Sequence, residues 1–442
     1  MHSLALIGES IASAEPSFCI PSSKSISNRL LIIEYLAGKS LQISNLSSSE
    51  DTVLLQKALQ KMRRLSTETK RLRLGMLTKA DKVACTADRV ELYCGNAGTT
   101  CRFLTALLSI TPGKWLLNAD KQMENRPLKP LIEALKQLGA DVEPQSKSTI
   151  FPLKITGKPL RGGQTLSLPA DLSSQFVSAL LLVAPYLQRG LSLELSPSQV
   201  SRPYIDMTTA LMKENGADVE IKDNILHISP QEYVFLSPAV EADWSAAAFA
   251  YALVAIRRIK ELKIKGLKAH SLQGDSVVAD LFSEHFNVKT DYFANHVVIS
   301  YCETISKQHK PLIISFKHYP DLFLPILMTA VCLNIPFEFQ GLETLAYKES
   351  DRLGGAIAEL KKVGVEISCG VDRIVRNDCK HATYADVAKT EIETYNDHRM
   401  AMAFALLASK YGNIRIKNPK CVSKSFPTYW TELSKFFRIE LL

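Results

Sequence analysis

Three segments of the chain share one pattern of apolar and polar positions. In each, apolar residues recur at three- and four-residue steps, a glycine follows, and apolar and polar residues then alternate; the segments are residues 131–142, 210–219 and 357–367. The first spacing predicts an amphipathic helix and the alternation predicts a strand, while glycine suits the left-handed position at a helix end. Each segment therefore predicts a helix that ends at a glycine and leads into a strand.

The same pattern returns at a regular distance. Gly139 and Gly216 are 77 residues apart, and Gly364 follows 148 residues later, which is twice 74. Three weaker copies, at residues 58–63, 281–287 and 433–439, lie where this period requires, with Arg63, Phe286 and Phe437 in place of the glycine. Six units of about 75 residues exceed the roughly 20–50 residues of a solenoid repeat, and each can hold two helices and several strands. They predict two domains of three units each; the alternative is chance recurrence, since helix–glycine–strand segments are common in α/β proteins.

Composition narrows the class of protein. The net charge of +8, from 53 Lys and Arg against 45 Asp and Glu, permits an anionic ligand but is too mild and dispersed to indicate nucleic acid. No uncharged apolar stretch approaches the roughly 18–20 residues of a membrane span, and the N-terminus lacks the basic segment of a signal peptide. Nine cysteines without a CxxC pair predict reduced thiols and no zinc site. We therefore expect a soluble cytoplasmic protein without metal.

One basic segment, residues 61–82, has no continuous apolar face. It is rich in Lys and Arg, and its apolar positions form no face beyond Leu65, Leu72, Leu74 and Leu77. This composition predicts an exposed, poorly packed loop; the alternative is an arm that binds nucleic acid.

Hydroxyl and basic side chains gather directly before predicted helices. The first cluster contains Lys24, Ser25 and Arg29 and precedes an apolar helix predicted for residues 30–36. Free backbone N–H groups and the helix dipole favour an anion there. The Walker sequence GxxxxGK[ST] is absent, so nucleotide hydrolysis is not indicated. The alternative, a serine-capped helix, accounts for the serines but not for Lys24 together with Arg29.

A loop at residues 95–102 links a strand predicted for residues 90–94 to a helix predicted from Phe103. It contains Asn96 and Gly98, and its two glycines let the backbone approach a ligand closely. The spacing is not the GxGxxG of dinucleotide sites. The loop therefore indicates an anion site, though by itself only weakly.

Three further arginines, Arg126, Arg352 and Arg399, lie at or near predicted helix starts. A guanidinium at that place opposes the helix dipole unless an anion compensates it. Together with Arg29 they form four such junctions. We infer a shared polyanionic ligand.

Uncharged donors and acid–base groups complete the candidate chemistry. Ser173, Ser174 and Gln175 could hold a polyol, although simple helix capping also explains them; Ser201 and Tyr204 are further donors. No GxSxG or HExxH motif accompanies them. The acid–base groups within the basic clusters are Lys24, Glu349, Asp351, Asp397, His398 and Lys424. This set predicts proton transfer on a bound polyanion, without metal or nucleotide.

Eight ordered motifs between residues 21 and 427 resemble those of the enolpyruvyl transferases, and most closely the members that act on shikimate 3-phosphate. They are Pro-Ser-Ser-Lys-Ser-Ile-Ser-Asn-Arg at 21–29, Gly-Asn-Ala-Gly-Thr at 95–99, Asn-Arg-Pro at 125–127, Ser-Ser-Gln-Phe at 173–176, Ser-Arg-Pro-Tyr-Ile-Asp at 201–206, Lys-Glu-Ser-Asp-Arg at 348–352, Asn-Asp-His-Arg-Met-Ala-Met at 396–402 and Lys-Ser-Phe-Pro at 424–427. The motifs extend over nearly the whole chain, which makes the resemblance highly specific.

The resemblance implies an α/β (α+β) fold of two similar domains, each built of three βαβαββ-type units as an inside-out α/β barrel. One domain would be discontinuous, residues 1–20 plus 241–442, and the other would be 21–240, with the ligand cleft between them. The family needs no cofactor and no metal. Its partners would be two small molecules, with no nucleic acid or membrane, and the resemblance favours a monomer.

The resemblance also implies the reaction. The enolpyruvyl group of phosphoenolpyruvate would pass to the 5-hydroxyl of shikimate 3-phosphate with release of phosphate, a step of the shikimate pathway toward chorismate and the aromatic amino acids. The catalytic residues would be Asp321, Glu349 and Lys24, with Asp321 taking the hydroxyl proton and Glu349 protonating the methylene carbon. Shikimate 3-phosphate would contact Lys24, Ser25, Arg29, Ser173, Ser174, Gln175, Ser201, Tyr204, Asp321 and Lys348. Phosphoenolpyruvate would contact Lys24, Asn96, Gly98, Arg126, Gln175, Arg352, His398, Arg399 and Lys424.

Some positions depart from the family pattern. Phe103 stands where proline is common, Thr344 where many members have asparagine, and Trp244 at a usually small position. Family members are inhibited by glyphosate at the phosphoenolpyruvate site, and Gly98 predicts a sensitive enzyme. Two alternatives are the transferase that acts on UDP-N-acetylglucosamine, which has a Lys-Asn pair rather than Lys24-Ser25 with Arg29, and a non-catalytic polyanion-binding relative.

Overall fold

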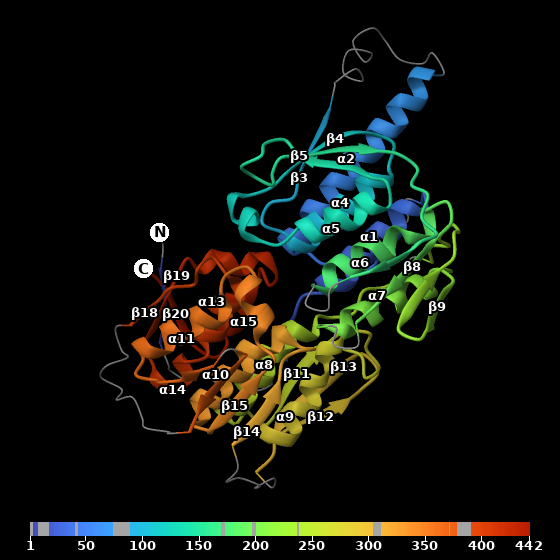
Figure 1. Cartoon of the computed structure of the whole chain (residues 1–442). Helices are drawn as coiled ribbons and strands as arrows, with labels where there is room; N and C mark the ends of the chain where they lie inside the picture. The colour runs from blue at the N-terminus through green and yellow to red at the C-terminus, as the bar shows by residue number, and fades with distance from the viewer. Residues whose placement is uncertain are drawn as a thin grey trace. The chain divides into compact units, whose positions relative to one another are not determined.

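The computed structural model describes residues 3–7, 17–39, 43–73, 89–168, 173–196, 200–236, 238–303, 311–370, 372–377 and 390–442, with the backbone alone for 66–73. The contacts divide the chain into unit 1 (Met1–Ser23 and Val240–Leu442) and unit 2 (Lys24–Ala239) (Figure 1). The domain bounds expected from the resemblance, 1–20 plus 241–442 and 21–240, stay a prediction. None of the described helices has the length and apolar composition needed to cross a bilayer.

Unit 1 contains three four-stranded sheets among its described residues, and one of them comes from a continuous βαβαββ segment. Its sheet order is β14-β15-β17-β16; the first pair is parallel and the other two pairs are antiparallel. The connecting helices follow the two parallel strands, as a parallel connection requires. In chain order the elements are β14 (Leu312–Ser315), α10 (Phe323–Leu333), β15 (Phe337–Gln340), α11 (Arg352–Lys362), β16 (Ser368–Cys369) and β17 (Arg373–Arg376).

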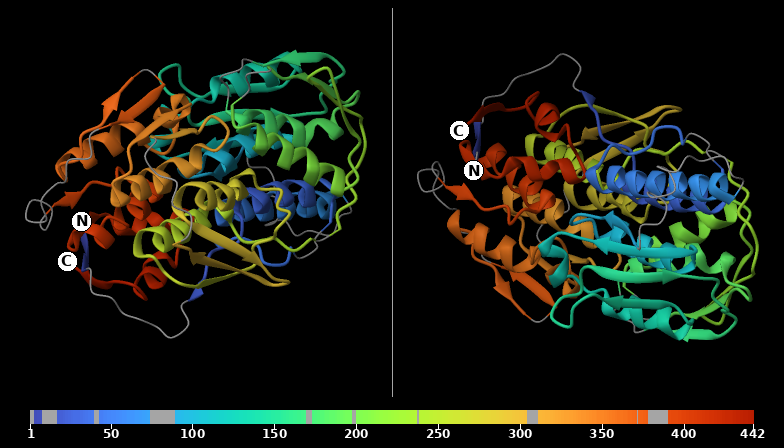
Figure 2. Two further views of the ribbon diagram at one scale, coloured as in Figure 1. Left: turned by 90° about the horizontal axis from the view of Figure 1, so that it is seen from below. Right: turned by 90° about the horizontal axis from the view of Figure 1, so that it is seen from above.

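The other two segments of unit 1 repeat this order but take one strand each from the start of the chain. The first consists of β2 (Ser17–Phe18), α8 (Trp244–Arg257), β11 (Leu262–Lys265), α9 (Val278–Phe286), β12 (Val288–Tyr292) and β13 (His296–Tyr301). The second consists of β18 (Glu391–Ile392), α13 (His398–Ala405), α14 (Ala408–Tyr411), β19 (Ile414–Lys417), α15 (Tyr429–Leu433), β20 (Arg438–Leu441) and β1 (Ser3–Ile7). Because β1 pairs with β20, the two ends of the chain lie side by side (Figure 2).

Unit 2 has two complete segments of the same type. One consists of β3 (Val90–Tyr93), α4 (Gly98–Ile110), β4 (Gly113–Asn118), α5 (Lys129–Gln137), β5 (Asp141–Pro144) and β6 (Leu153–Gly157). The other consists of β7 (Thr165–Ser167), α6 (Ser174–Val183), β8 (Leu191–Glu194), α7 (Arg202–Glu214), β9 (Val219–Lys222) and β10 (Ile225–Ile228). The described part of the remaining segment is α1 (Lys24–Leu36), α2 (Glu50–Arg73) and a parallel bridge between Ser44 and Ala239. The six repeats are therefore seen as five complete segments and one described in part.

Helices fill the centre of each unit, and the sheets lie outside them. In unit 2, α1, α4 and α6 pack on one another; in unit 1, α10 packs on both α8 and α13. These helices are apolar almost all round, as buried helices are, and every residue of α10 from Phe323 to Cys332 is buried. The strands alternate instead: in β14, Leu312 is buried and Ile313 is exposed. This is the inside-out arrangement expected from the resemblance, and it places the starts of the inner helices where side chains can form a site.

Short 3-10 turns precede or follow several of these helices and carry side chains of the candidate site. They are η1 (Lys121–Asn125), η2 (Ala184–Tyr186), η3 (Gly274–Val277), η4 (Pro320–Leu322), η5 (Glu343–Tyr347) and η6 (Pro419–Lys424).

The three glycine helix ends are confirmed: Gly139, Gly216 and Gly364 have φ of +90°, +85° and +73°. In two of the three weaker copies, the helix does not end as the residue aligned with the glycine predicts. The αL residue after α9 is Asn287 (φ +57°) and not Phe286, because asparagine tolerates this conformation. Helix α2 continues through Arg63 to Arg73.

The expectation of a poorly packed loop at 61–82 is therefore wrong for residues 61–73, which are helical; residues 74–82 lie outside the described residues. Lys and Arg are good helix formers, and Met62 provides a buried position on the inner face. Arg63 forms an ion pair with Glu34 at 2.7 Å, and Lys61 donates to the carbonyl oxygen of Glu91 at 2.8 Å. These charged side chains thus connect α2 to α1 and to β3.

Candidate active site

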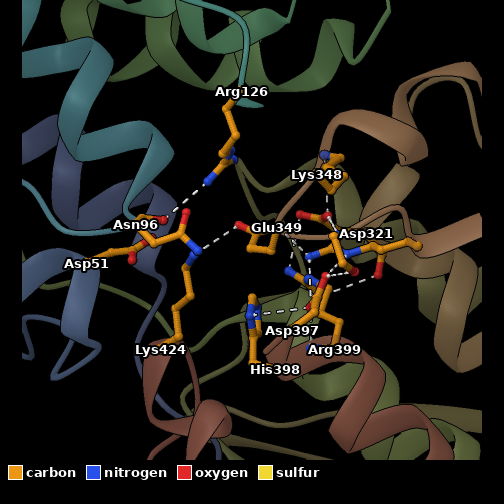
Figure 3. A network of polar contacts seen from close by, with 12 residues as sticks. Asp51, Asn96, Arg126, Asp321, Lys348, Glu349, Asp397, His398, Arg399 and Lys424 are labelled. Carbon is orange, nitrogen blue, oxygen red and sulfur yellow. Dashed lines mark hydrogen bonds and ion pairs between the residues drawn. The ribbon is translucent and has the colours of Figure 1, made fainter. Parts of the chain in front are cut away.

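In unit 1 a buried arginine joins three carboxylates, Asp321 and Glu349 of one segment and Asp397 of the next. Figure 3 shows these three labelled carboxylates near one another. Arg352 is the first residue of α11 and is 1% exposed. Its Nη1 donates to Asp321 Oδ1 at 2.9 Å, its Nη2 to Glu349 Oε2 at 2.7 Å, and its Nε to Asp397 Oδ2 at 2.9 Å. A planar guanidinium can serve three acceptors in this way, whereas an ammonium group cannot match the geometry. The sequence motif Lys-Glu-Ser-Asp-Arg therefore provides the centre of a network.

The start of α13 supplies the next part of the network. Asp397 caps this helix, because its Oδ1 accepts from the Arg399 N–H at 2.9 Å. Arg399 Nη2 donates to Asp321 Oδ2 at 3.1 Å, and Nη1 to the Asp321 carbonyl oxygen at 3.3 Å. The His398 ring is buried, with Nδ1 3.7 Å from Asp397 Oδ1. Asp397 thus accepts from the Arg352 guanidinium and also caps the start of α13.

Two lysines complete the group in unit 1. Lys348 Nζ lies 3.5 Å from Asp321 Oδ1, and Lys424 Nζ, at the end of η6, lies 3.6 Å from Glu349 Oε1. Burial lowers the pKa of Lys348, and Asp321 only partly opposes that effect. Burial raises the pKa of Asp321, but Arg399, Lys348 and Arg352 outweigh burial and hold that pKa well below its usual value. Asp321 is therefore a carboxylate whose proton affinity depends on the cations around it.

In unit 2, Lys24 begins α1 and pairs with Asp51, a residue that the sequence analysis did not select. Lys24 Nζ lies 2.9 Å from Asp51 Oδ2. Asp51 is buried in the first turn of α2, and its carbonyl oxygen accepts from Thr100 Oγ1 at 2.7 Å. Asp51 thereby links α2, α4 and the predicted catalytic lysine. An acidic residue in a helix's first turn is too common to have revealed this role from the sequence.

The loop at 95–102 brings two arginines onto its second glycine. An added Cβ at Gly98 would lie 2.5 Å from Arg102 Nη1 and 2.5 Å from Arg126 Nη2. Arg126 Nη1 donates to the Asn96 carbonyl oxygen at 3.3 Å, and Arg102 Nη1 to Gln175 Oε1 at 2.8 Å. The helix α4 begins at Gly98 rather than at Phe103, so the loop backbone itself forms the helix N-terminus. Asn96, Gly98, Arg126 and Gln175 are therefore one cluster, with Arg102 as a member that the sequence analysis missed.

We predict that Gly98→Ala weakens phosphoenolpyruvate binding without unfolding the protein. The methyl group collides with the movable ends of Arg102 and Arg126, so these side chains shift rather than the backbone. One displaced charge-assisted bond is worth roughly 1.5–3 kcal/mol, so KM for phosphoenolpyruvate should rise about ten- to a hundredfold. Steady-state kinetics with phosphoenolpyruvate and glyphosate as varied ligands measures this, and the glyphosate inhibition constant should rise by more than KM.

Gly139→Ala is the matched control for this substitution. Gly139 has φ of +90° and nothing within 4 Å of an added Cβ, so alanine is strained there but displaces no side chain. It should lower the unfolding temperature and leave KM unchanged. An unchanged KM in Gly98→Ala would place Gly98 outside the binding site.

At the start of α6, Ser173 caps the helix, which is the alternative role that the sequence analysis gave for this residue. Its Oγ accepts from the Gln175 N–H at 3.3 Å, so Ser173 is the N-cap of the helix. Ser174 is buried in the first turn. Contacts of Ser173, Ser174 and Gln175 with a substrate stay a prediction.

Arg29 is directed at protein groups from three helices. Its Nε donates to Thr208 Oγ1 at 2.7 Å, and Nη2 donates to Ser178 Oγ at 3.0 Å. Further bonds go to the carbonyl oxygens of Ser25 (2.9 Å) and Tyr204 (3.2 Å), which uses four of its five N–H groups. Burial lowers the pKa of Arg29 to about 10. Arg29 therefore joins α1, α6 and α7, and its contact with a ligand stays a prediction.

The positions that depart from the family pattern have structural partners. Phe103 is buried in α4, and the Arg29 guanidinium lies 5.6 Å from the centre of its ring. Trp244 is the first residue of α8, is fully buried, and packs against Tyr251 with ring centres 6.4 Å apart. Ser201, by contrast, belongs to a motif that matches the family; it adopts the left-handed conformation (φ +54°) directly before α7.

Comparison with known proteins places the chain in a family. Residues 12–433 match the family model of EPSP synthase (3-phosphoshikimate 1-carboxyvinyltransferase). The chain is 38% identical over 417 residues to a 3-phosphoshikimate 1-carboxyvinyltransferase of Bacteroides fragilis (strain YCH46), covering 94% of each chain, and 34% identical over 427 residues to that of Vibrio atlanticus (strain LGP32), covering 94% of this chain and 95% of the relative.

Solved structures agree in fold. The EPSP synthase of Acinetobacter baumannii aligns over 100% of both chains with a TM-score of 0.72 and 20% identity. The enolpyruvyl transferase NikO of Streptomyces tendae aligns over 100% of this chain and 99% of that chain, with a TM-score of 0.70 and 16% identity. With the family match over most of the chain and the relatives above 30% identity, the chain belongs to the EPSP synthase (3-phosphoshikimate 1-carboxyvinyltransferase) family.

Proposed function

We propose that this enzyme transfers the enolpyruvyl group of phosphoenolpyruvate to the 5-hydroxyl of shikimate 3-phosphate and releases phosphate. The observation that carries the proposal is the network around Arg352, in which four cations from two segments of unit 1 surround Asp321 and Glu349. A set of cations with two carboxyl groups among them suits anionic substrates that exchange protons.

Phosphoenolpyruvate is the ligand we assign to the arginines and to Lys424. Its phosphate and carboxylate would compete with Asp321 and Glu349 for Arg352, Arg399 and Lys424. The same ligand would contact Lys24, Asn96, Gly98, Arg126, Gln175 and His398.

Shikimate 3-phosphate is the ligand we assign to the hydroxyl-rich helix starts of unit 2 and to Asp321 with Lys348. Ser25, Ser173, Ser174, Ser201 and Tyr204 would hold its hydroxyl, carboxylate and phosphate groups, with Arg29 fixing the helices that present them. Hydrogen bonds from neutral hydroxyls suit a polyol, and charge-assisted bonds suit its phosphate.

The chemistry follows from the two carboxyl groups. Asp321 would take the proton of the 5-hydroxyl, assisted by Lys24, so that this oxygen bonds to C2 of phosphoenolpyruvate while Glu349 protonates C3. A proton from C3 would then return to Glu349 as the C2–O bond to phosphate breaks, which restores the double bond, and the proton held by Asp321 would leave with the released phosphate.

Release of phosphate from phosphoenolpyruvate tests the proposal. We expect release with shikimate 3-phosphate and none with UDP-N-acetylglucosamine. Release with the sugar nucleotide alone would make the chain the related UDP-sugar transferase, and release with neither would make it a non-catalytic anion-binding relative. The monomeric state and the cytoplasmic location stay predictions.

A further inference from the structure

A tight turn directly before α13 has an uncommon backbone conformation. Tyr395 and Asn396 both have left-handed φ, of +52° and +55°, and across them the Asp397 N–H donates to the Thr394 carbonyl oxygen at 2.8 Å. Turns with two left-handed central residues favour glycine, asparagine and aspartate, so Asn396 suits its place. A bulky residue such as tyrosine is an outlier there, because its Cβ crowds its own backbone. The strain of this turn therefore lies at Tyr395.

The side chain of Tyr395 is held by α11. Its hydroxyl donates to Glu359 Oε1 at 2.7 Å, and Glu359 is 1% exposed. Glu359 Oε2 accepts from the Glu393 N–H at 3.0 Å and from Lys362 Nζ at 2.5 Å. Hydrogen bonds to a carboxylate are stronger than those between neutral groups. One buried carboxylate thus binds the chain both before the turn and within it.

The Tyr395 ring also lies against α11. A Cβ added at Gly355 would be 3.1 Å from Tyr395 Cε2 and 3.3 Å from Tyr395 Cδ2, which is closer than side chains usually approach. Glycine inside a helix is otherwise unfavourable, and here it leaves room for the ring. The ring contact and the hydroxyl bond are separate observations that fix the same side chain to the same helix.

The residues directly after the turn belong to the candidate active site, where Figure 3 shows Asp397 and Arg399 beside Asp321. Asp397 accepts from Arg352 Nε at 2.9 Å, and Arg399 Nη2 donates to Asp321 Oδ2 at 3.1 Å. Arg352 is the first residue of α11, and Glu359 lies on the same helix. Strained backbone persists only where the surrounding structure holds it, and it is concentrated at functional sites. The strained turn thus lies between its anchor on α11 and the arginine of the site.

We propose that Glu359 and Tyr395 are positioning residues, which keep the turn before α13 left-handed and so direct Arg399 at phosphoenolpyruvate. This rests on the proposed function. Without the hydroxyl bond, the backbone at Tyr395 relaxes toward an ordinary conformation, and Arg399, four residues further along, loses its direction. Both residues act through Arg399 and not by contact with the substrate.

Steady-state kinetics of Tyr395→Phe tests the anchor. The ring stays and one hydroxyl bond is lost, so KM for phosphoenolpyruvate should rise about three- to tenfold. A loss of binding alone leaves kcat unchanged, and KM for shikimate 3-phosphate should also stay within about twofold. Glu359→Gln keeps the size of the side chain and should show the same change. In the double variant the two effects should not add, because both substitutions weaken one shared bond.

Tyr395→Asn separates strain from the loss of a contact. This substitution removes both the hydroxyl bond and the ring, but asparagine adopts the left-handed conformation readily. Its KM for phosphoenolpyruvate should therefore be closer to the wild-type value than that of Tyr395→Phe. A role in packing alone predicts the opposite order.

Tyr251→Phe is the matched control in unit 1. It removes the hydrogen bond between Tyr251 Oη and Thr290 Oγ1 (2.8 Å), which lies on α8 and β12. The unfolding temperature should fall, and both KM values should equal those of the wild type.

The outcomes distinguish the inference from the proposed function. Wild-type KM for phosphoenolpyruvate in both Tyr395→Phe and Glu359→Gln would overturn the inference and leave the proposed function standing, as would a Tyr395→Asn variant impaired as much as Tyr395→Phe or more. If Glu359→Gln does not fold, the two substitutions of Tyr395 decide by themselves. A folded wild type that releases no phosphate from phosphoenolpyruvate with shikimate 3-phosphate would overturn the proposed function, and the inference with it.

Discussion

Glu349→Gln should lower kcat by about 10²–10⁴, the usual contribution of a positioned acid. Glutamine retains the size of the side chain and an oxygen for Arg352, which now donates to Glu349 Oε2 at 2.7 Å, but it has no proton to deliver to carbon. The affinity for shikimate 3-phosphate should stay within about threefold, because Glu349 is assigned to the other substrate. Rapid-quench kinetics and calorimetry measure the two quantities separately.

Glu343→Gln is the matched control, since Glu343 is exposed in η5 six residues earlier. Its kcat should equal that of the wild type. If Glu349→Gln retains turnover, another group protonates the methylene carbon, and His398 is the next candidate. In that case His398→Gln should show the loss expected here for Glu349.

Arg352→Lys should destabilise unit 1 and weaken phosphoenolpyruvate binding although the charge is kept. Lysine cannot serve Asp321, Glu349 and Asp397 at once, and breaking a buried pair costs about 3–5 kcal/mol. With part of the charge retained we expect about 3 kcal/mol of lost stability, measured by urea unfolding. KM for phosphoenolpyruvate should rise at least about tenfold.

The contrast is Arg373→Lys. Arg373 lies 3.5 Å from Glu338, and these side chains are 58% and 29% exposed. An exposed pair contributes about 0–1 kcal/mol, so this variant should unfold like the wild type. Equal stability losses in the two variants would show that the Arg352 network stabilises unit 1 no more than an exposed ion pair does.

The local pattern of apolar and polar residues was sufficient to predict the helices, the strands and the repeat. The helix ends at Gly139, Gly216 and Gly364 depend only on a residue without Cβ after an amphipathic segment, and all three adopt positive φ. The motifs at 348–352, 396–402 and 424–427 also contain most of the residues around Arg352, whereas Asp321 lies in none of the motifs and was named only through the resemblance to the family. Residues that are neighbours in the sequence lie close together at a helix start in any fold.

Only the tertiary structure decided which of these residues meet. Lys24 pairs with Asp51, 27 positions away, and Arg352 with Asp397, 45 positions away; neither distance follows from a helix or strand period. Arg29 likewise donates a hydrogen bond to Thr208, 179 positions away, and β1 pairs with β20 in the last sheet. These contacts depend on how whole helices pack, because burial of a charge is compensated by partners from any element that the packing brings near. The sequence by itself therefore determined the repeat, the helix ends and the candidate chemistry, whereas the partners of the charged groups were set by packing between distant segments.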